Sequence, residues 1–225
     1  MPTQILTLTL KTDKPVEDSA AKLRGFIGHK FRDYPILHHH IKEVGFLYTY
    51  PKVQYKILEG TPIILGIEEG AEVLKTISSD IEQLRLGNNT YYVNQIQINQ
   101  SNVKIEPTAG NHQYRFLTPW LALNPENYKK FKQMRGWKEK KIFLNNILVG
   151  NILSMCKGLD LVVDDELLAH TRIEEQSTEY KGIPVTSFLG KFEINFDIPD
   201  FFGLGKGVSQ GFGVVKRNTD GAGEG

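Results

Sequence analysis

The chain has 225 residues and a mass of 25.5 kDa, which allows one domain with a sizeable core or two compact domains of about a hundred residues each. Hydrophobic residues make up 40% of the sequence and charged residues 24%, which excludes a wholly disordered or fibrous protein. The 27 Lys and Arg and the 26 Asp and Glu give a net charge of +1, so the overall charge gives no sign of a polyanionic partner.

The single cysteine, Cys156, cannot form an intramolecular disulfide, which favours a reducing compartment. The N-terminus lacks the basic segment and long apolar run of a secretion signal. The apolar runs at 63–65 and 147–149 are far shorter than the roughly 18 residues that span a bilayer. We therefore expect a cytoplasmic protein without a membrane segment, in which the tail at 218–225 is a flexible end because it has no core-forming residue.

The first half predicts a mixture of strands and helices. Residues 4–10 alternate leucine with threonine, which indicates a strand with one buried face. Asp13 and Pro15 signal the start of a helix that ends near Phe31, since the residue before Pro35 is pushed toward extended geometry. The remaining segments are strands at 46–58 and 62–67, a helix at 70–84 and a strand pair at 91–105. This is the order of a ferredoxin-like βαββαβ unit with an additional hairpin.

The second half repeats the scheme less clearly. A strand at 114–123 precedes a helix that is opened by Asn124 and interrupted by Gly136, and a second helix then ends at Gly158. Apolar and polar residues alternate at 192–198, which is typical of an antiparallel sheet with one exposed face.

The expected fold class is therefore α+β, with tandem ferredoxin-like (RRM-like) domains, antiparallel sheets and a glycine-rich loop near the C-terminus. We expect the domains at 1–109 and 110–217, joined near Pro107 and Gly110. The halves share no obvious sequence repeat, so this division rests on element order alone.

The most unusual feature is a glycine-rich stretch at 203–213, which holds five of the 21 glycines of the chain. Its pattern is Gly-apolar-Gly, five residues, Gly-apolar-Gly. Glycine permits positive φ and close approach, so backbone N–H groups can turn outward toward a phosphate. The pattern is neither a P-loop, because Lys206 precedes a glycine rather than Ser or Thr, nor a dinucleotide fingerprint. A connection between strands without a ligand is the alternative interpretation.

A histidine cluster is the second feature. His38, His39 and His40 are half of the six histidines in the chain. In an extended stretch the side chains of His38 and His40 point the same way, which suits a general acid and a general base near neutral pH. A metal ion would need further ligands, and a run of surface histidines without a role is also open. The neighbouring residues that could complete a metal site are His29, Asp33 and Glu43.

The charges are unevenly distributed along the chain. The segment 128–141 carries seven basic residues and one acidic residue, with Tyr128, Phe131 and Trp137 between them, whereas 159–180 carries seven acidic residues and one arginine. A basic segment with aromatic neighbours fits phosphate contact and base stacking. A solvated helix face whose aromatic residues lie in the core is the alternative.

Together these features resemble the CRISPR repeat-cleaving endoribonucleases of the RAMP superfamily. The resemblance rests on the element order, on the histidines after the first helix and on the glycine pattern at 203–205 and 211–213. It implies a metal-independent endoribonuclease without a cofactor, which cleaves CRISPR precursor RNA within the repeat to give guide RNAs. The ribose 2′-OH would attack the adjacent phosphorus and leave a 2′,3′-cyclic phosphate and a 5′-hydroxyl.

The resemblance also implies roles for individual residues. His40 is expected to be the principal acid/base and His38 its partner, with His29 as the fallback. Lys30 and Lys52 would neutralise the phosphorane charge, and Tyr48 is a weaker candidate donor. The residues expected to bind RNA are Gly203, Gly205, Lys206, Gly207, Gly211 and Gly213 in the glycine-rich stretch, and Arg135 and Lys138 in the basic segment.

The expected partner is CRISPR repeat RNA, and effector-complex proteins and a second copy of the chain are further partners that the resemblance allows. Two alternative functions stay open. One is a RAMP-type subunit that holds guide RNA without cleaving it, and the other is a metal-dependent hydrolase that uses the His38–His40 cluster. The paired histidines favour the nuclease over the pure binder, because binding alone needs no imidazoles there.

Overall fold

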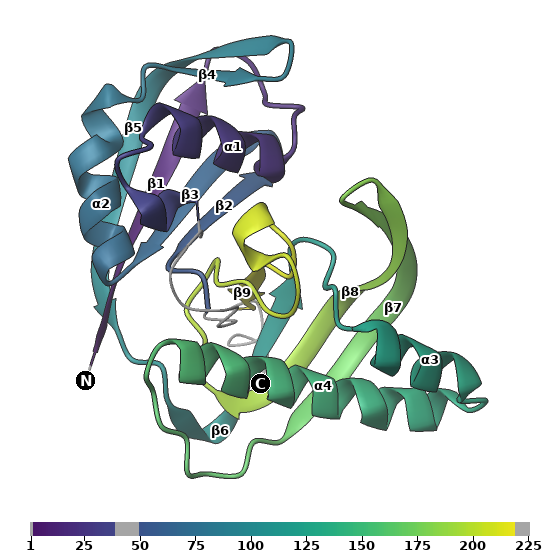
Figure 1. The fold of residues 1–225 in the computed structure, drawn as a ribbon. Helices are drawn as coiled ribbons and strands as arrows, with labels where there is room; N and C mark the ends of the chain where they lie inside the picture. Colours follow the sequence, from purple (N-terminus) through teal and green to yellow (C-terminus); the bar gives the residue numbers. More distant parts are fainter. Residues whose placement is uncertain (1, 39–49, 219–225) are drawn as a thin grey trace, which may run out of the picture. The chain divides into compact units, whose positions relative to one another are not determined.

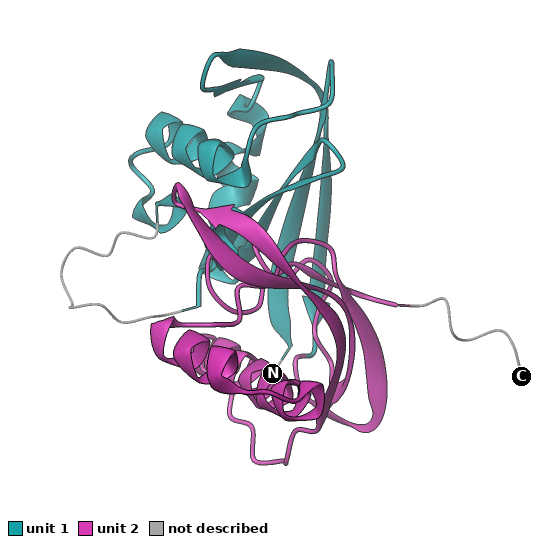
Figure 2. Cartoon of the chain, turned by 90° about the vertical axis from the view of Figure 1, so that its right-hand side faces the viewer, with its two compact units in different colours: residues 1–104, 208–211 teal, residues 105–207, 212–225 magenta. Residues whose placement is uncertain are grey.

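The structure is a computed structural model that describes residues 2–38 and 50–218. The chain forms two compact units, coloured separately in Figure 2. Unit 1 consists of residues 1–104 together with 208–211, and unit 2 consists of residues 105–207 and 212–225. Among the helices in these described ranges, none is long and apolar enough to cross a membrane.

Unit 1 contains a five-stranded antiparallel sheet in the order β2-β3-β1-β5-β4, with its α-helices on one face (Figure 1). Its elements in chain order are β1 (Thr3–Thr12), α1 (Ala20–Lys30), the 3₁₀ turn η1 (Pro35–Leu37), β2 (Val53–Leu58), β3 (Thr61–Ile67), α2 (Glu69–Ile77), the 3₁₀ turn η2 (Ser78–Asp80), β4 (Gln83–Leu86) and β5 (Asn89–Val103), with the 3₁₀ turn η3 (Val208–Gln210) added from the far end of the chain. The predicted first strand is confirmed, because Leu6, Leu8 and Leu10 are fully buried on one face of β1.

The predicted start of the first helix is wrong. α1 begins at Ala20, where the Ser19 side chain caps the helix by accepting a hydrogen bond from the backbone N–H of Lys22. Asp13 instead accepts a hydrogen bond from the backbone N–H of Tyr92, 2.9 Å away, so it anchors the connection to β5. The second helix is also shorter than predicted, since α2 ends at Ile77 and the expected helical residues 83–84 belong to β4.

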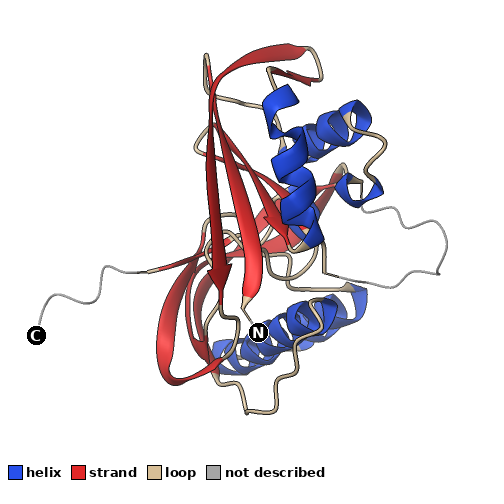
Figure 3. Ribbon diagram, turned by 90° about the vertical axis from the view of Figure 1, so that its left-hand side faces the viewer, coloured by secondary structure: helices blue, strands red, loops and turns tan. Residues whose placement is uncertain are grey.

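Unit 2 contains a four-stranded antiparallel sheet in the order β7-β8-β6-β9. Its elements are β6 (Pro107–Phe116), α3 (Pro125–Gln133), α4 (Trp137–Gly158), β7 (Ala169–Tyr180), β8 (Ile183–Phe196) and β9 (Val215–Arg217). Gly136 separates α3 from α4 as predicted, but β6 lies earlier than the predicted strand at 114–123. In each unit the α-helices (blue in Figure 3) lie on one side of the strands (red), as the ferredoxin-like arrangement requires.

The core of unit 2 is aromatic. Phe116 stacks on Trp120 with ring centroids 5.2 Å apart, and Phe131 of α3 meets Phe188 of β8 edge to face at 5.6 Å. Between β8 and β9, where a ferredoxin-like unit has its second crossover helix, the chain instead forms an irregular connection that contains the glycine-rich stretch. Most of this connection belongs to unit 2, whereas its residues 208–211 belong to unit 1.

Candidate active site

His38 directly follows the 3₁₀ turn η1 in unit 1. Its backbone is helical, with φ −96° and ψ −16°, so the extended geometry assumed for the histidine segment is wrong at this residue. The argument that His38 and His40 point the same way therefore does not apply. His39, His40 and Tyr48 lie outside the described residues.

The imidazole of His38 lies against the backbone of α1 at Gly28. A Cβ atom added to Gly28 would come within 2.5 Å of Cε1 and 2.6 Å of Nδ1 of His38, closer than any real side chain approaches a ring. The absence of a side chain at Gly28 therefore creates the space that the ring occupies. This role could not be read from the sequence, where Gly28 is one glycine in a helical pattern.

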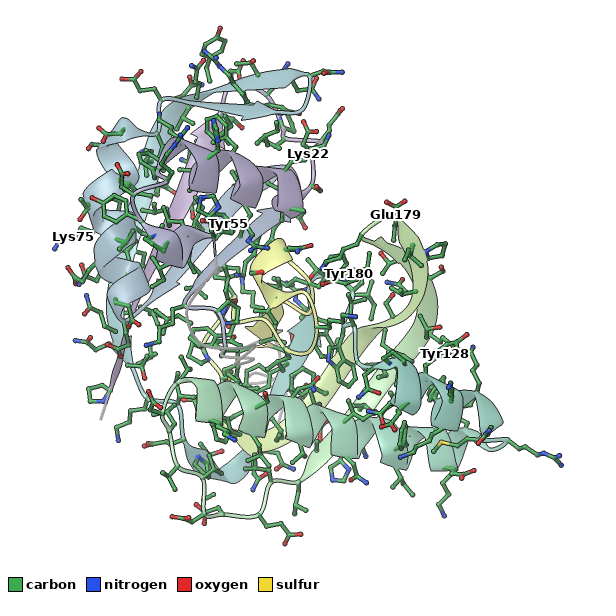
Figure 4. All side chains as sticks on the ribbon, viewed as in Figure 1. Lys22, Tyr55, Lys75, Tyr128, Glu179 and Tyr180 are labelled. Atoms are coloured by element: carbon green, nitrogen blue, oxygen red, sulfur yellow. The ribbon has the colours of Figure 1, made fainter. Side chains whose placement is uncertain are left out.

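Two further side chains hold the backbone of this segment. The Arg24 guanidinium, one turn before Gly28 on α1, donates a hydrogen bond to the carbonyl of His38. The Tyr55 hydroxyl on β2 donates one to the carbonyl of Leu37, 3.2 Å away. Figure 4 labels Tyr55, which is fully buried, and this burial raises the pKa of its hydroxyl so that it remains a neutral donor. The two consecutive carbonyls before and at His38 are thus anchored from two elements.

The two lysines predicted to neutralise phosphorane charge have different partners. The Lys30 amino group donates to the backbone carbonyl of Asp80, a neutral acceptor. Lys52 forms an ion pair with Glu69, with Nζ 2.6 Å from one carboxylate oxygen and 2.8 Å from the other. Partial burial acts to raise the pKa of Glu69, but the hydrogen bond and charge of Lys52 hold that pKa below its ordinary value. Within the described residues, no hydrogen bond joins either lysine to His38.

The surroundings of the histidine cluster also bear on the metal alternative. His29 lies in the last turn of α1 and Asp33 just beyond it, both exposed, and Glu43 is outside the described residues. In residues 2–38 and 50–218 there is no group of three or more His, Cys, Asp or Glu side chains placed to hold a metal ion.

The glycine-rich stretch packs tightly against the protein itself. Gly205, Gly207, Gly211 and Gly213 all have positive φ, between 62° and 85°. In unit 2, a Cβ on Gly205 would lie 2.8 Å from Nε1 of Trp120, and one on Gly213 would collide with the carbonyl oxygen of Leu204. Glycine is therefore required at these positions by the packing of the protein, whatever the stretch binds.

Several backbone N–H groups of this stretch are already used inside the protein. Those of Leu204, Lys206 and Gly213 donate to the carbonyls of Gly213, Leu121 and Pro119 respectively, and those of Gly211 and Phe212 donate to Val208 and Gly207. These five donors face protein carbonyls. The amino group of Lys206, by contrast, is at the surface.

A basic and aromatic cluster that the sequence did not predict surrounds Lys206. Its Nζ lies 5.1 Å from the ring centre of Tyr180, and Lys181 approaches the same ring at 5.6 Å. The ring of Phe212 meets Tyr180 edge to face at 5.5 Å. Tyr180, which is labelled in Figure 4, is the last residue of β7. Two segments that are distant in sequence therefore combine two ammonium groups with two aromatic rings.

The basic segment is not one helix. Arg135 is exposed in the connection between α3 and α4, and Lys138 is exposed in the first turn of α4. Of the interleaved aromatic residues, Phe131 is buried in the core as the alternative interpretation predicted, whereas Tyr128 and Trp137 are 43% and 52% exposed. An exposed indole between two cations is available for stacking on a base.

Comparison with known families accounts for both units. A model of the Cas6b N-terminal domain matches residues 1–104, and a model of the Cas6b C-terminal domain matches residues 106–218. The chain belongs to the Cas6b family. The resemblance to CRISPR repeat-specific endoribonucleases of the RAMP type is thereby confirmed.

Solved structures agree with this assignment. A crystal structure of Cas6b is 31% identical, with a TM-score of 0.87, covering 97% of this chain and 100% of that one. A structure described as the CRISPR RNA processing endoribonuclease Cas6b is 27% identical, with a TM-score of 0.76, covering 96% and 100%. An RNA-binding RAMP protein, 11% identical with a TM-score of 0.54 over 97% and 100% of the two chains, shares the fold, which confirms the tandem ferredoxin-like class. An uncharacterised protein of Methanocaldococcus jannaschii is 46% identical over 105 residues, which are 46% of this chain and 71% of that protein.

Proposed function

We propose that this protein is an endoribonuclease that cleaves CRISPR precursor RNA within the repeat to release guide RNAs. The observation that carries the proposal is the match of both halves to Cas6b, one of whose solved relatives is described as a CRISPR RNA processing endoribonuclease. The close packing of the His38 ring against Gly28 of α1 supports the nuclease, because a protein that only binds RNA has no need to hold an imidazole so closely.

The proposed reaction needs no metal. The ribose 2′-OH loses its proton to a general base and attacks the adjacent phosphorus, and a general acid protonates the departing 5′-oxygen. His40 and His38 are the proposed pair, with Tyr48 as a further donor. Histidine suits both steps, because its ordinary pKa of about 6.5 leaves both protonation states populated near neutral pH.

Of the two lysines, Lys30 is the one we propose to stabilise the charge of the phosphorane. The phosphorane carries an additional negative charge, which a nearby cation stabilises. The charge of Lys30 faces a neutral carbonyl, whereas that of Lys52 is already shared with Glu69. Lys52 would have to leave its carboxylate partner before it could act on the phosphorane.

RNA binding is proposed to use surface side chains more than backbone groups. Lys206, with Lys181 and Tyr180 beside it, offers ammonium groups for phosphates, and the glycines of 203–213 shape the stretch that presents it. Arg135 and Lys138, next to Trp137, are the proposed contacts of the basic segment.

The proposal is tested with the parent protein and a repeat RNA in EDTA, under single-turnover conditions. Cleavage with a cyclic phosphate at the 3′ end and a 5′-hydroxyl is expected. The variant His40→Ala is expected to lose about 10²–10⁴ in rate, the usual value of a general acid or base, while His29→Ala keeps the parental rate.

Three other results would each support a different reading. Activity that vanishes in EDTA and returns with zinc or manganese would establish the metal-dependent hydrolase. Tight RNA binding without any cleavage would establish the guide-binding subunit. Loss of rate in His29→Ala but not in His40→Ala would move the catalytic role to the fallback histidine.

A further inference from the structure

The sheet of unit 2 carries a row of four basic side chains that crosses all four of its strands. Arg115 on β6 pairs with Lys216 on β9 and with Lys191 on β8, and Lys191 pairs with Arg172 on β7. Residues directly opposite each other in antiparallel strands project from the same face of the sheet. We call Lys216, Arg115, Lys191 and Arg172 the cation row.

The cation row lies on the face of the sheet opposite to the helices. Each of the four residues has a buried neighbour on its strand: Tyr114 and Phe116 on β6, Phe192 on β8, Thr171 and Ile173 on β7, and Val215 on β9. Because side chains alternate along a strand, the row must project from the other face. Arg115, Lys191 and Arg172 are exposed and Lys216 is half-buried.

This arrangement is unfavourable for the protein alone. Adjacent strands lie about 4.8 Å apart, so four like charges share a line of roughly 14 Å, and like charges directly opposite each other destabilise a sheet. Within the described residues, the only ion pair of the row is between Arg172 and Glu193, at 3.6 Å, and Arg172 is 77% exposed there. The excess positive charge is therefore left for a polyanion to neutralise.

A shallow hollow beside the row provides hydrogen-bonding groups. Two positions farther along the strands, on the same face of the sheet, are Gln113, Glu193 and His170. Glu193 pairs with the other two, and all three line the hollow with Arg172 and Lys191. Phe192 also lines it, but that side chain is buried, so its ring is not available for stacking. We therefore expect contacts to phosphates to supply most of the affinity, while the Gln113 amide and the His170 imidazole form hydrogen bonds to base edges.

We propose that the cation row binds the phosphates of a single-stranded RNA segment that crosses the open sheet of unit 2. An open four-stranded sheet presents one continuous face, and a single strand of RNA can lie across it in an extended form, as in other RNA-binding domains of this architecture. The inference rests on the proposed function for the identity of the RNA. If the protein cuts a repeat, it must also hold the nucleotides on either side of the cut, and the cation row would bind such a segment.

The test measures binding of a fluorescently labelled 12-nucleotide oligouridylate to the full chain as salt is varied. For the double variant Arg115→Gln/Lys191→Gln we expect roughly tenfold weaker binding or more at low salt. The plot of log affinity against log salt should become shallower by about 1.4, since each phosphate contact to a single strand contributes about 0.7 to that slope.

A matched control variant separates the effect of the cation row on binding from the effect of lowering the net charge. Lys75→Gln/Lys157→Gln removes the same two charges from exposed positions on α2 and α4 and should leave both affinity and slope close to the parent. A variant with the opposite expected effect is Glu193→Gln, which removes the carboxylate that pairs with Arg172 and should tighten binding several-fold. Melting temperatures should not fall in the row variant, because the lost charges repel each other.

Equal losses in the row variant and the control would overturn the inference, as would unchanged binding in the row variant. A loss as large on a 12-base-pair RNA duplex as on oligouridylate would overturn the single-strand assignment. If the parent binds oligouridylate through the row but never cleaves repeat RNA, the inference stands and the proposed nuclease function fails.

Discussion

Gly28 is the residue on which the geometry of His38 depends most directly. The imidazole is a flexible side chain, so a methyl group at Gly28 would push the ring aside without breaking the helix. Gly25, three residues earlier on α1, has no atom within 4 Å of an added Cβ. The two glycines therefore differ in their contact with His38 while sharing one helix.

The variant Gly28→Ala should lose cleavage rate while keeping RNA affinity. Both Gly28→Ala and Gly25→Ala gain up to about 1 kcal/mol of helix propensity, so neither is expected to unfold α1. We expect a rate loss of about tenfold to a hundredfold for Gly28→Ala and none for Gly25→Ala, measured by single-turnover cleavage and by RNA binding. Changed NMR chemical shifts of the His38 ring protons in Gly28→Ala alone would show that the ring has moved.

Equal rates for both alanine variants would contradict the positioning role of Gly28. The double variant Gly28→Ala/His38→Ala gives an independent check. Once the imidazole is removed, alanine at 28 meets no ring, so the second substitution should change the rate no further.

Lys56 is a buried lysine that no part of the proposed mechanism uses. It is fully buried on β2, and its amino group lies 3.2 Å from Oε1 of Gln54. Burial lowers its pKa from 10.5 to about 7. The folded protein therefore favours the neutral amine, while the unfolded chain keeps the proton up to a much higher pH.

The free energy of unfolding should rise with pH between about 7 and 10.5 because of Lys56. In that interval the unfolded state binds more protons than the folded state, and below pH 7 the penalty for burying the amine is fully present. Lys56→Met should therefore stabilise the protein by a few kcal/mol, on the order of the pKa shift, at pH 6 and by little at pH 10. Urea unfolding at pH 6, 8 and 10 measures this, and a pH-independent difference would contradict it.

At the scale of elements, the irregular connection between β8 and β9 owes its path to glycine. An α-helix there would leave the backbone unable to approach Trp120 and Leu204 as closely as Gly205 and Gly213 do. The stretch therefore shapes unit 2 before it contacts any RNA. The same conformation brings Lys206 to the ring of Tyr180.

Gly213→Ala should destabilise the protein by at least about 2 kcal/mol. A left-handed φ costs an alanine roughly 1–2 kcal/mol, and its Cβ would collide with the carbonyl oxygen of Leu204. Gly110→Ala is the matched control, because nothing lies within 4 Å of its Cβ and its effect should stay within about 0.5 kcal/mol. Thermal unfolding of both variants checks the difference, and similar melting temperatures would contradict it.

At the scale of the whole molecule, unit 1 depends on a segment from the far end of the chain. Residues 208–211 belong to unit 1, where Gly211 lies against the Ala20 side chain and the carbonyl of Tyr55. These are the helix and the strand that hold the His38 segment. Residues 208–211 are thus part of the structure around the candidate active site.

Gly211→Val should loosen that packing. The added side chain would meet the Cβ of Ala20 at 2.8 Å or less, and φ of 85° is unfavourable for a branched residue. Hydrogen exchange should become faster in peptides that cover the start of α1 and β2 and stay unchanged in those that cover β4 and β5. Uniform protection in all four elements would show that residues 208–211 contribute nothing to unit 1.

Local patterns were sufficient to predict most elements. The leucine and threonine alternation in β1, the break at Gly136 and the alternation in β8 depend on neighbouring residues, which a sequence displays directly. The start of α1 was mispredicted because both Asp13 and Ser19 are able to cap a helix, and only the hydrogen bond from Tyr92 decides between them. The histidine, glycine and basic segments could be found because their composition is unusual.

The net charge of +1 also separates what the sequence determines from what only the fold determines. The sequence by itself determined that the charges cancel overall, that the chain has two ferredoxin-like halves and that histidines follow the first helix. Only the tertiary structure decided that the His38 ring packs against Gly28 and that Glu69 pairs with Lys52. Likewise, only the strand register placed the four residues of the cation row side by side. These relations join residues far apart in the chain, and strand register and packing set them, so no local pattern encodes them.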